Sequence, residues 1–325
     1  MHLNLLRNTG ILCFLILTIS CTPIEKSEVS ISLKPELTIG IEEGDENYMF
    51  GGIATIEEDE EGNIYVLDFK FRTIKKYDKN GKFIKNIGKK GQGPGEIPQF
   101  TVDMALKNGK IYLLLINMVI IYDKDGNYLN SFKLGLFPHY ILVDSQEKII
   151  LVEADVKTSK YFHVFDSNGK HLSSFGEVFK APNLELKKIS ERWHPASVFL
   201  SKKGRLFVVH PFQYEILIYK DMDLERTVKR RSKNYESPRV QTEGGGYYRE
   251  GGIQRIFDVG DYLMVFLNGV KKGKFIEVFD KRDFSYKGSS KIEINGYPEP
   301  TQNGSIYFSD EWRITKFKII IKGMR

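Results

Sequence analysis

A short apolar segment that follows a turn recurs six times along the chain. Each copy continues from its turn as a run of mostly apolar residues, with the length typical of a buried β-strand. The six copies lie at 61–68, 108–114, 147–152, 203–209, 260–266 and 303–308. Repetition of one pattern along the chain predicts a domain built from repeated structural units.

Each unit is predicted to contain four antiparallel strands. An inner strand such as 51–56 precedes the repeated segment, and a further strand follows it and ends at an aspartate. The next strand, as in 82–88, alternates apolar and polar residues, which indicates one face toward solvent. The recurring aspartates are Asp78, Asp123, Asp166 and Asp280. Because they recur at matching points, mostly beside Asn-Gly or Asp-Gly turns, we expect them to cap turns through nearby backbone amides.

The units together predict an all-β fold, a six-bladed β-propeller of four-stranded antiparallel blades. A lone four-stranded sheet leaves two faces and an edge uncovered, whereas a radial arrangement gives every sheet two neighbours. The last unit ends soon after 312–321 and lacks an outer strand. Residues 31–39 have a strand pattern but no unit of their own, so we expect this N-terminal strand to complete the last blade and close the ring.

Composition supports one sheet-rich domain. Of the 325 residues, 41% are hydrophobic and 13% aromatic, which is enough for a large β core. The formal net charge of +6 gives no reason to expect a nucleic-acid partner. One dense basic stretch, 229–233, is expected to be a solvated loop, with a phosphate or anionic head-group site as the alternative.

The N-terminus has the features of an export signal. The apolar run at 11–17 is shorter than the roughly 20 residues that cross a membrane. Ser20 and Cys21 then resemble the lipobox of bacterial lipoproteins, in which the cysteine is lipidated and becomes the first mature residue. The alternative is an uncleaved apolar anchor. The predicted divisions are a signal peptide at 1–20, a lipidated tether at 21–30 and the propeller at 31–325.

The location predicted from these features is the cell envelope. Acyl chains on Cys21 would make the membrane a partner, and no compact acidic signal for surface display follows this residue. We therefore expect an outer-membrane lipoprotein that faces the periplasm. Both cysteines, Cys13 and Cys21, lie in the N-terminal segment, so no disulfide is expected in the folded body.

The segment that joins the first two units resembles part of a known family. It reads Gly-Lys-Lys-Gly-Gln-Gly-Pro-Gly-Glu-Ile at 88–97 and leads into a new inner strand. It is similar to the blade connection of NHL-type propellers and, more closely, to that of the six-bladed propeller lipoproteins of Bacteroidota, with Ile97 in place of phenylalanine. The resemblance implies the fold, while related propellers include lyases, lactonases and binding modules. The segment enters a strand and lacks the Lys-Ser or Lys-Thr of a nucleotide-binding loop, so its glycines are expected to permit a tight crossing between blades.

Candidate ligand-binding residues should precede or begin the inner strands, because the loops at those points converge at one end of a propeller axis. The candidates are His139, Tyr140, Arg192, Trp193, His194, Tyr247, Tyr248, Arg249 and Arg255. Those at 247–249 belong to a long segment, 235–252, which is either part of a surface for a sugar, peptide or anion or a connector packed over the axis. The acidic run at 57–61 is expected to be solvated.

Two histidines are candidate ligands for a metal ion, zinc or calcium. His139 and His194 lie at comparable points in consecutive units. A catalytic zinc site needs three protein ligands, and His210 or Glu96 is the candidate for the third. The alternative is that both histidines are hydrogen-bonded loop residues without a metal.

These observations favour a noncatalytic module that binds a small molecule, glycan, peptide or protein. The alternative is a metal-assisted lyase or lactone hydrolase whose site lies at the central channel, with an envelope sensor as a third hypothesis. Serine catalysis has no support, because the chain lacks a Gly-x-Ser-x-Gly motif.

Overall fold

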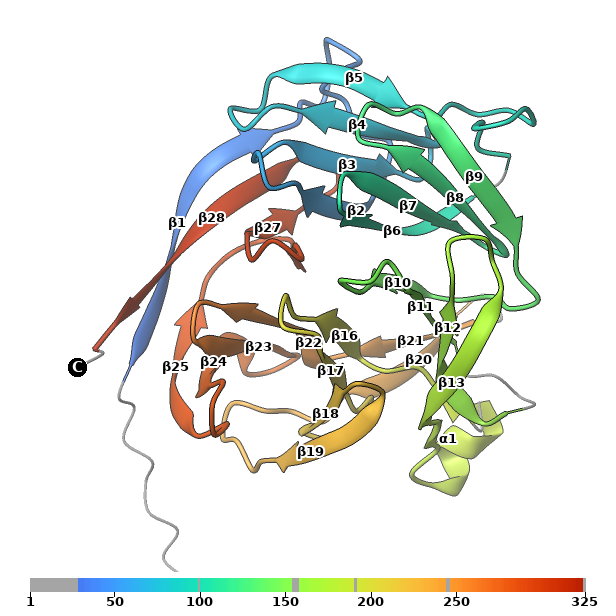
Figure 1. Cartoon of the computed structure of the whole chain (residues 1–325). Coiled ribbons are helices and arrows are strands. Elements are labelled where there is room, and N and C mark those ends of the chain that lie inside the picture. The colour runs from blue at the N-terminus through green and yellow to red at the C-terminus, as the bar shows by residue number, and fades with distance from the viewer. Residues whose placement is uncertain (1–28, 99, 154–157, 190–191, 244–245, 324–325) are drawn as a thin grey trace, which may run out of the picture.

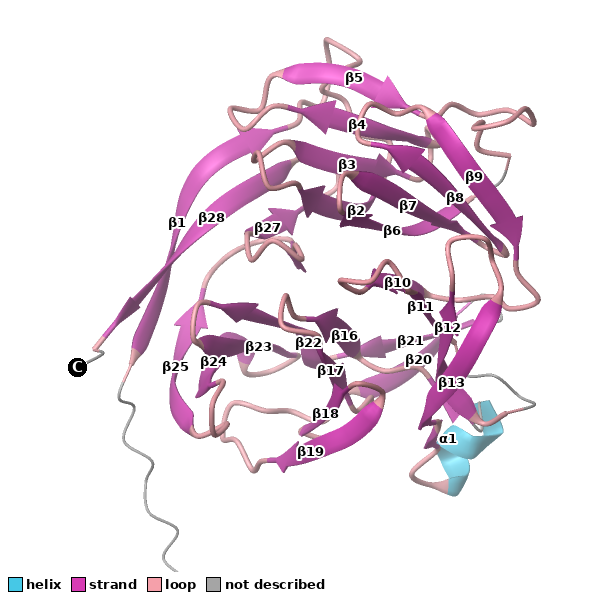
Figure 2. Ribbon diagram, viewed as in Figure 1, coloured by secondary structure: helices cyan, strands magenta, loops and turns pink. Residues whose placement is uncertain are grey.

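The computed structural model describes residues 29–323, apart from 99, 154–157, 190–191 and 244–245. Six four-stranded antiparallel sheets stand around a central axis in this part of the chain (Figures 1 and 2). The fold is therefore the predicted all-β, six-bladed propeller. The described residues include one short helix, α1 (Leu184–Ile189). Among them, no helix has both the length and the apolar character needed to cross a membrane.

The strands of each blade follow one another from the axis outward, except in the sixth blade. The first three blades contain β2 (Ile53–Glu58), β3 (Ile64–Asp68), β4 (Thr73–Tyr77) and β5 (Phe83–Ile87); β6 (Thr101–Lys107), β7 (Lys110–Leu115), β8 (Met118–Asp123) and β9 (Tyr128–Lys133); and β10 (Tyr140–Val143), β11 (Ile149–Val152), β12 (Lys160–Phe165) and β13 (His171–Glu177). The fourth and fifth contain β16 (Ser197–Leu200), β17 (Arg205–Val209), β18 (Glu215–Lys220) and β19 (Asp223–Lys229); and β22 (Gly252–Val259), β23 (Tyr262–Gly269), β24 (Gly273–Asp280) and β25 (Tyr286–Ile292). The sixth contains β26 (Tyr297–Pro300), β27 (Ile306–Ser309), β28 (Ile314–Lys322) and β1 (Ser30–Ile39). Two small hairpins pair β14 (Phe179–Lys180) with β15 (Arg192–Trp193) and β20 (Arg239–Glu243) with β21 (Gly246–Glu250).

Packing between blades explains the apolar runs in the sequence. All five residues of β3 are buried, because this strand has a neighbouring blade on both faces. One core cluster joins the first two blades through Tyr65, Leu67, Ile74, Ile111, Leu113 and Ile120. Each sheet therefore depends on its neighbours for burial of its apolar side chains.

The recurring aspartates cap turns, as predicted. The Oδ1 atom of Asp78 accepts hydrogen bonds from the backbone amides of Asn80 and Lys82, both at 2.9 Å. Equivalent bonds recur at Asp123 and Asp166, and Asp280 accepts one from the amide of Arg282. These carboxylates are therefore engaged in local turn structure.

The glycine-rich connection between the first two blades is tightly packed. Gly88 and Gly95 have φ angles of 69° and 72°, in the left-handed region that favours glycine. A Cβ atom on Gly95 would lie 2.7 Å from Cβ of Tyr128, and the Tyr122 hydroxyl donates to the Gly95 carbonyl at 2.9 Å. This close crossing is the role that the sequence predicts for the segment.

The N-terminal strand closes the ring, as predicted. In Figure 1, β1 lies along β28, and the register pairs Ser30 with Lys322 and Ile39 with Ile314. The inner strands β26 and β2 are also in contact, so the last blade meets the first. Because β1 occupies the outer position, the edge left by the C-terminal blade is covered by the opposite end of the chain.

The acidic run at 57–61 does not lie wholly in solvent, which corrects the sequence expectation. Glu57 and Glu58 belong to β2 and are 5% and 9% exposed. Glu57 accepts a hydrogen bond from the backbone amide of Gln302 at 3.1 Å, and Glu58 accepts one from the Tyr307 hydroxyl at 2.7 Å. These partners come from the sixth blade, more than 240 residues away along the chain.

The basic stretch at 229–233 is also more than a solvated loop. Arg230 lies 3.3 Å from Oε2 of Glu277, whose side chain is fully buried, and its guanidinium is 3.6 Å from the Tyr286 ring centroid. Tyr214 donates a hydrogen bond to the same carboxylate at 2.8 Å. The stretch therefore connects the fourth blade to the fifth, because a buried carboxylate needs a charged or hydrogen-bonding partner.

The predicted signal peptide, Cys21 and most of the tether lie outside the described residues. The described chain begins at Val29, whose amide donates to the Lys287 carbonyl at 3.1 Å. Lipidation and location therefore stay predictions.

Deleting residues 22–40 should destabilise the propeller strongly. The deletion removes β1 and leaves β28 as an open edge, so we expect the melting temperature to fall by roughly 10 °C or more. Circular dichroism melts of the two chains measure the effect. A matched deletion of 22–28, which keeps β1, should melt like the wild type. An unchanged melting temperature in the longer deletion would contradict closure by β1.

Candidate functional site

The two ends of the propeller axis differ in the segments that form them. We call the end where the inner strands begin the loop end, because loops from the preceding blades reach it. We call the opposite end the turn end, because the hairpin turns that follow the inner strands lie there. The sequence-predicted candidates belong to the loop end.

A cluster of charged side chains lines the inner strands between the two ends. Asp103 accepts hydrogen bonds from the Thr55 hydroxyl at 2.7 Å and from the Ile141 amide at 3.0 Å, so it links three consecutive blades. Arg255 forms an ion pair with Glu299, with 3.4 Å between Nη2 and Oε2. We call Glu57, Asp103, Arg255 and Glu299 the axial cluster.

The axial cluster holds three carboxyl groups and one guanidinium. Burial raises the pKa of Glu57, Asp103 and Glu299, and the charge of Asp103 raises the pKa of the other two further. Arg255 interacts electrostatically with Glu299, Tyr140 and Asp103. Two sequence-predicted residues, Tyr140 and Arg255, therefore come together at the axis. Arg255 lies within the inner strand β22, and Tyr140 begins β10.

His139 and His194 also come together, as their matching positions suggest. Their ring centroids are 4.0 Å apart, although the residues belong to different blades. The Nδ1 atom of His194 is buried and has no hydrogen-bond partner in the described part of the chain. Burial lowers the pKa of both histidines, and the proximity of His139 contributes to lowering the pKa of His194 to about 4. The pair is therefore neutral at pH 7.

A third metal ligand does not accompany this pair. Within the described residues, no group of three or more His, Cys, Asp or Glu side chains could hold a metal ion. Glu96 pairs with Lys89 at 3.1 Å, and Nδ1 of His210 accepts the Phe212 amide at 3.0 Å. The third ligands considered from the sequence are thus engaged elsewhere, and the two histidines fall short of the three ligands of a catalytic zinc site.

Trp193 does not offer an aromatic surface to a ligand, which corrects the prediction for this residue. Its side chain is 3% exposed and packs edge to face against Phe212, with 4.7 Å between centroids. The hairpin of β14 and β15 holds it in this position. The side chains of Arg192, Tyr247, Tyr248 and Arg249 lie outside what the structure describes. The ligand-binding roles of these four residues stay predictions.

A pocket of about 540 Å³ lies at the turn end. Hairpin turns of the first four blades and the sixth surround it, with residues 58–61, 106–110, 143–145, 200–202, 204 and 302–303 among those that line it. Its volume falls within the range typical of small-molecule sites. The turns are connected to one another, since Lys202 donates to Oδ1 of Asn303 at 2.7 Å and Asn303 donates to the Asp59 carbonyl at 3.0 Å.

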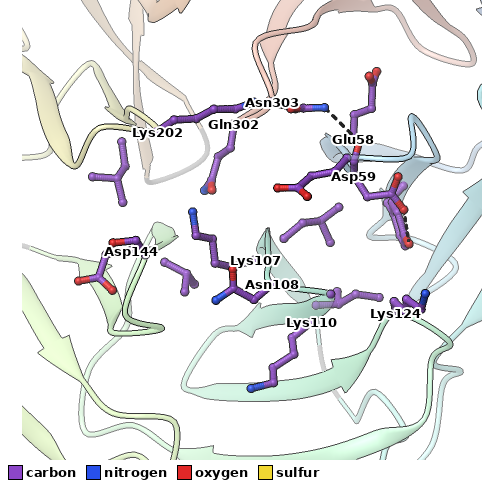
Figure 3. Close-up of a pocket in the computed structure, with 18 of the residues that line it drawn as sticks. Glu58, Asp59, Lys107, Asn108, Lys110, Lys124, Asp144, Lys202, Gln302 and Asn303 are labelled. Atoms are coloured by element: carbon purple, nitrogen blue, oxygen red, sulfur yellow. Dashed lines mark hydrogen bonds between the residues drawn. The ribbon is translucent and has the colours of Figure 1, made fainter.

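Lys107 and Gln302 supply polar groups for a ligand in this pocket. Figure 3 shows the two side chains pointing toward each other across the pocket, from the second and sixth blades. Neither side chain forms a hydrogen bond or ion pair with another residue in the described ranges. Neither residue is among the sequence-predicted candidates, because those candidates were sought where inner strands begin and in the loops that precede them. The available signal was their position at the end of an inner strand, because Lys107 is the last residue of β6 and Gln302 lies two residues after β26.

Fold and pocket together define a six-bladed β-propeller with an axial polar site. The chain belongs to the DUF5128 family, whose model is described as a six-bladed β-propeller and matches residues 41–245. This family assignment agrees with the resemblance inferred from the blade connection, for which the NHL-type label is only a loose match.

Solved structures with the same fold include proteins of Bacteroides. A Bacteroides fragilis protein described as exported shares 16% identity, with a TM-score of 0.62 and coverage of 90% of this chain and 96% of that one. A DUF4221 member from Bacteroides vulgatus shares 14% identity, with a TM-score of 0.61 and coverage of 89% and 98%. Virginiamycin B lyase from Staphylococcus aureus shares 14% identity, with a TM-score of 0.53 and coverage of 90% and 100%. No similar sequence was found among curated proteins.

Replacing His194 with Phe should make folding less sensitive to acid. The pKa of His194 is about 4 in the folded protein against 6.5 for an ordinary histidine, so the unfolded chain binds more protons between these values. Stability therefore falls as the pH drops through this range. Urea unfolding at pH 7 and pH 5 measures how much free energy of unfolding each protein loses on acidification. We expect this loss to be smaller in the variant than in the wild type, by roughly 1 kcal/mol after allowance for solvent screening.

His171→Phe is the matched control, because His171 lies exposed on the outer strand β13. Its pH dependence should follow that of the wild type. Equal losses of unfolding free energy in the wild type and in His194→Phe would show that the buried histidine does not contribute to the pH dependence of stability.

Proposed function

We propose that this protein is an envelope lipoprotein whose propeller is a noncatalytic binding module. Its ligand is a small polar compound with at least one negative charge, such as an acidic sugar or a peptide carboxylate. The observation that carries this proposal is the turn-end pocket, into which Lys107 and Gln302 project without a partner among the described residues. An ammonium and an amide in this arrangement suit a carboxylate or hydroxyl-bearing ligand.

The acidic residues around the pocket do not cancel this preference for an anion. Asp59 accepts hydrogen bonds from the backbone amides of Glu61 and Asn63 at 3.0 and 2.8 Å. Asp144 caps its own turn in the same way. Glu58 accepts a hydrogen bond from Lys316, at 2.6 Å. These three carboxylates are therefore engaged, and Lys107 and Gln302 are among the side chains left to meet a ligand.

A metal-assisted lyase or hydrolase at the loop end is the second candidate. The specific support is the contact of His139 with His194 and the buried, unbonded Nδ1 atom of His194. The donor set within the described residues stops at two ligands, so the binding module is the better-supported proposal.

Replacing Lys107 with Met should weaken ligand binding at least tenfold. Loss of one charge-assisted hydrogen bond costs about 1.5–3 kcal/mol, which corresponds to this factor. The probes are glucuronate, galacturonate and short peptides with free carboxylates, with glucose and galactose as uncharged counterparts. Thermal shift and calorimetry should show binding of at least one acidic probe to the wild type and weaker binding of its neutral counterpart.

Lys82→Met is the matched control for this experiment. Lys82 is an exposed lysine in the first blade and does not line the pocket. Its variant should bind like the wild type. The proposed pocket would be rejected if no acidic probe binds, or if Lys107→Met binds the probe as tightly as the wild type does.

Cys21→Ser should abolish acylation of the exported protein. The proposed modification requires the thiol of this residue, so metabolic labelling with palmitate should mark the wild type and not the variant. The variant should leave the membrane fraction, while Cys13→Ser should remain labelled and bound. Labelling that persists in Cys21→Ser would contradict a lipid anchor at this position.

A further inference from the structure

Exposed apolar side chains gather at the loop end of the propeller. Among the described residues, fourteen large hydrophobic side chains are exposed. Eight lie in segments between blades, at the start of an inner strand, or in turns between the second and third strands, all of which reach the loop end: Ile41, Phe71, Phe100, Ile116, Phe137, Leu184, Val270 and Tyr297. The other six lie on outer strands or on the turn before one: Ile84, Tyr128, Leu129, Leu172, Met222 and Leu224. Of the fourteen, only Met222 lies on a hairpin turn at the turn end.

Four of the eight side chains lie on adjacent segments. Arg72, next to Phe71, donates to the Pro98 carbonyl at 3.0 Å and so joins the first blade to the loop that carries Phe100. Thr101 pairs with Leu115 across β6 and β7, which brings the segments of Phe100 and Ile116 together.

The next contact extends this surface to the third blade. The amide of Leu134 donates to the Asn117 carbonyl at 2.7 Å and joins the turn of Ile116 to the loop of Phe137. Phe71, Phe100 and Phe137 are 52%, 65% and 60% exposed. With roughly 200 Å² in each phenylalanine, these three side chains alone expose more than about 300 Å², which is in the range of the largest apolar patch on a typical monomer, often a functional one.

Cations border this apolar surface. Lys70, Lys90 and Lys133 are exposed. Lys70 adjoins Phe71, Lys133 lies four residues before Phe137, and Lys90 lies ten residues before Phe100 in the same connection between blades. None of the three side chains forms an ion pair with a described residue. Carboxylates occur at 42–46, on the segment that enters the first blade. We call Phe71, Phe100, Ile116, Phe137 and the three lysines the loop-end patch.

The path of the N-terminal strand determines which end of the propeller faces away from an anchor. The start of β1 packs on the start of β25, where Val29 donates to Lys287, and β1 then runs to Ile39 at the loop end. Ten strand residues cover about 33 Å. The eight residues between Cys21 and Ser30 can extend at most about 30 Å. In addition, β1 lies on the sixth blade, whereas the patch lies on the first three blades.

We propose that the loop-end patch binds a partner protein that presents an apolar segment flanked by carboxylates. This choice of a protein over a bilayer rests on the proposed anchor at Cys21, which holds the membrane near the turn end. The phenylalanines supply the apolar contact, and the lysines attract the acidic flanks. The patch is distinct from the pocket, which opens at the opposite end of the axis.

The experiment uses the mature protein as a target for a phage-displayed library of random linear peptides. Enriched peptides should combine aromatic or aliphatic residues with Asp or Glu. Their affinity, measured by fluorescence anisotropy, should fall at least tenfold for the triple variant Phe71→Ser, Phe100→Ser and Phe137→Ser. The charge variant Lys70→Glu, Lys90→Glu and Lys133→Glu should weaken binding to a similar extent.

Leu129→Ser, Leu172→Ser and Leu224→Ser form the matched control, because these leucines are exposed on outer strands. This triple variant should bind the peptides like the wild type, and melting curves should confirm that all variants fold. Equal peptide binding by wild type and the patch variant, or no enrichment, would overturn the proposal. Vesicles of phosphatidylglycerol and phosphatidylcholine test the alternative that the patch binds a membrane. Patch-dependent binding to these vesicles without peptide binding would assign the patch to a membrane.

The result for the docking surface can be distinguished from the result for the lipid anchor. If Cys21 is not acylated but patch-dependent peptide binding is found, the docking surface stands and only its orientation relative to the membrane is lost. If Cys21 is acylated and no peptide binds, the anchor stands and the docking surface is rejected.

Discussion

Burial of each blade between two others is the constraint on which this structure depends. The second strands are apolar on both faces, as the fully buried β3 shows, so an isolated blade would expose most of its core. The core clusters reflect this dependence, since Tyr65 and Leu67 of the first blade pack with Ile111 and Leu113 of the second. Polar contacts also link each blade to its two neighbours, since Asp103 accepts hydrogen bonds from Thr55 on one side and from Ile141 on the other. Stability is thus a property of the closed ring.

The fold could be predicted from the sequence because its signals are local and repeated. Turn residues, apolar runs and recurring aspartates define each unit, and the surplus strand near the N-terminus identifies the outer strand of the last blade. The buried charges could not be predicted, because their partners are remote in sequence. Glu57 meets Gln302 only when the sixth blade packs against the first, and Arg230 meets Glu277 only when the fourth blade packs against the fifth. A run of charged residues carries no sign of such contacts.

The candidate site was predicted in part. His139 and His194 meet because matching positions in consecutive units are brought side by side. Tyr140 and Arg255 belong to the third and fifth blades and interact because both lie on inner strands around the axis. Trp193 is buried instead, since a small hairpin packs it against Phe212, a contact that the blade repeat does not encode. Lys107 was missed because it stands next to an ordinary turn of the repeat. A pocket formed by five such turns becomes visible only when their relative positions in space are known.

The pairing of β1 with β28 has a consequence for how the chain reaches its native state. Ser30 pairs with Lys322, so the first strand of the propeller to be synthesised is among the last to find its partner. Contacts between such distant segments slow folding, because the intervening loop must be organised first. Until the C-terminal residues are available, the sixth blade lacks its outer strand and the fifth blade lacks a complete neighbouring blade. A chain cut short by even its last ten residues would keep most of its blades and still lack a closed circle.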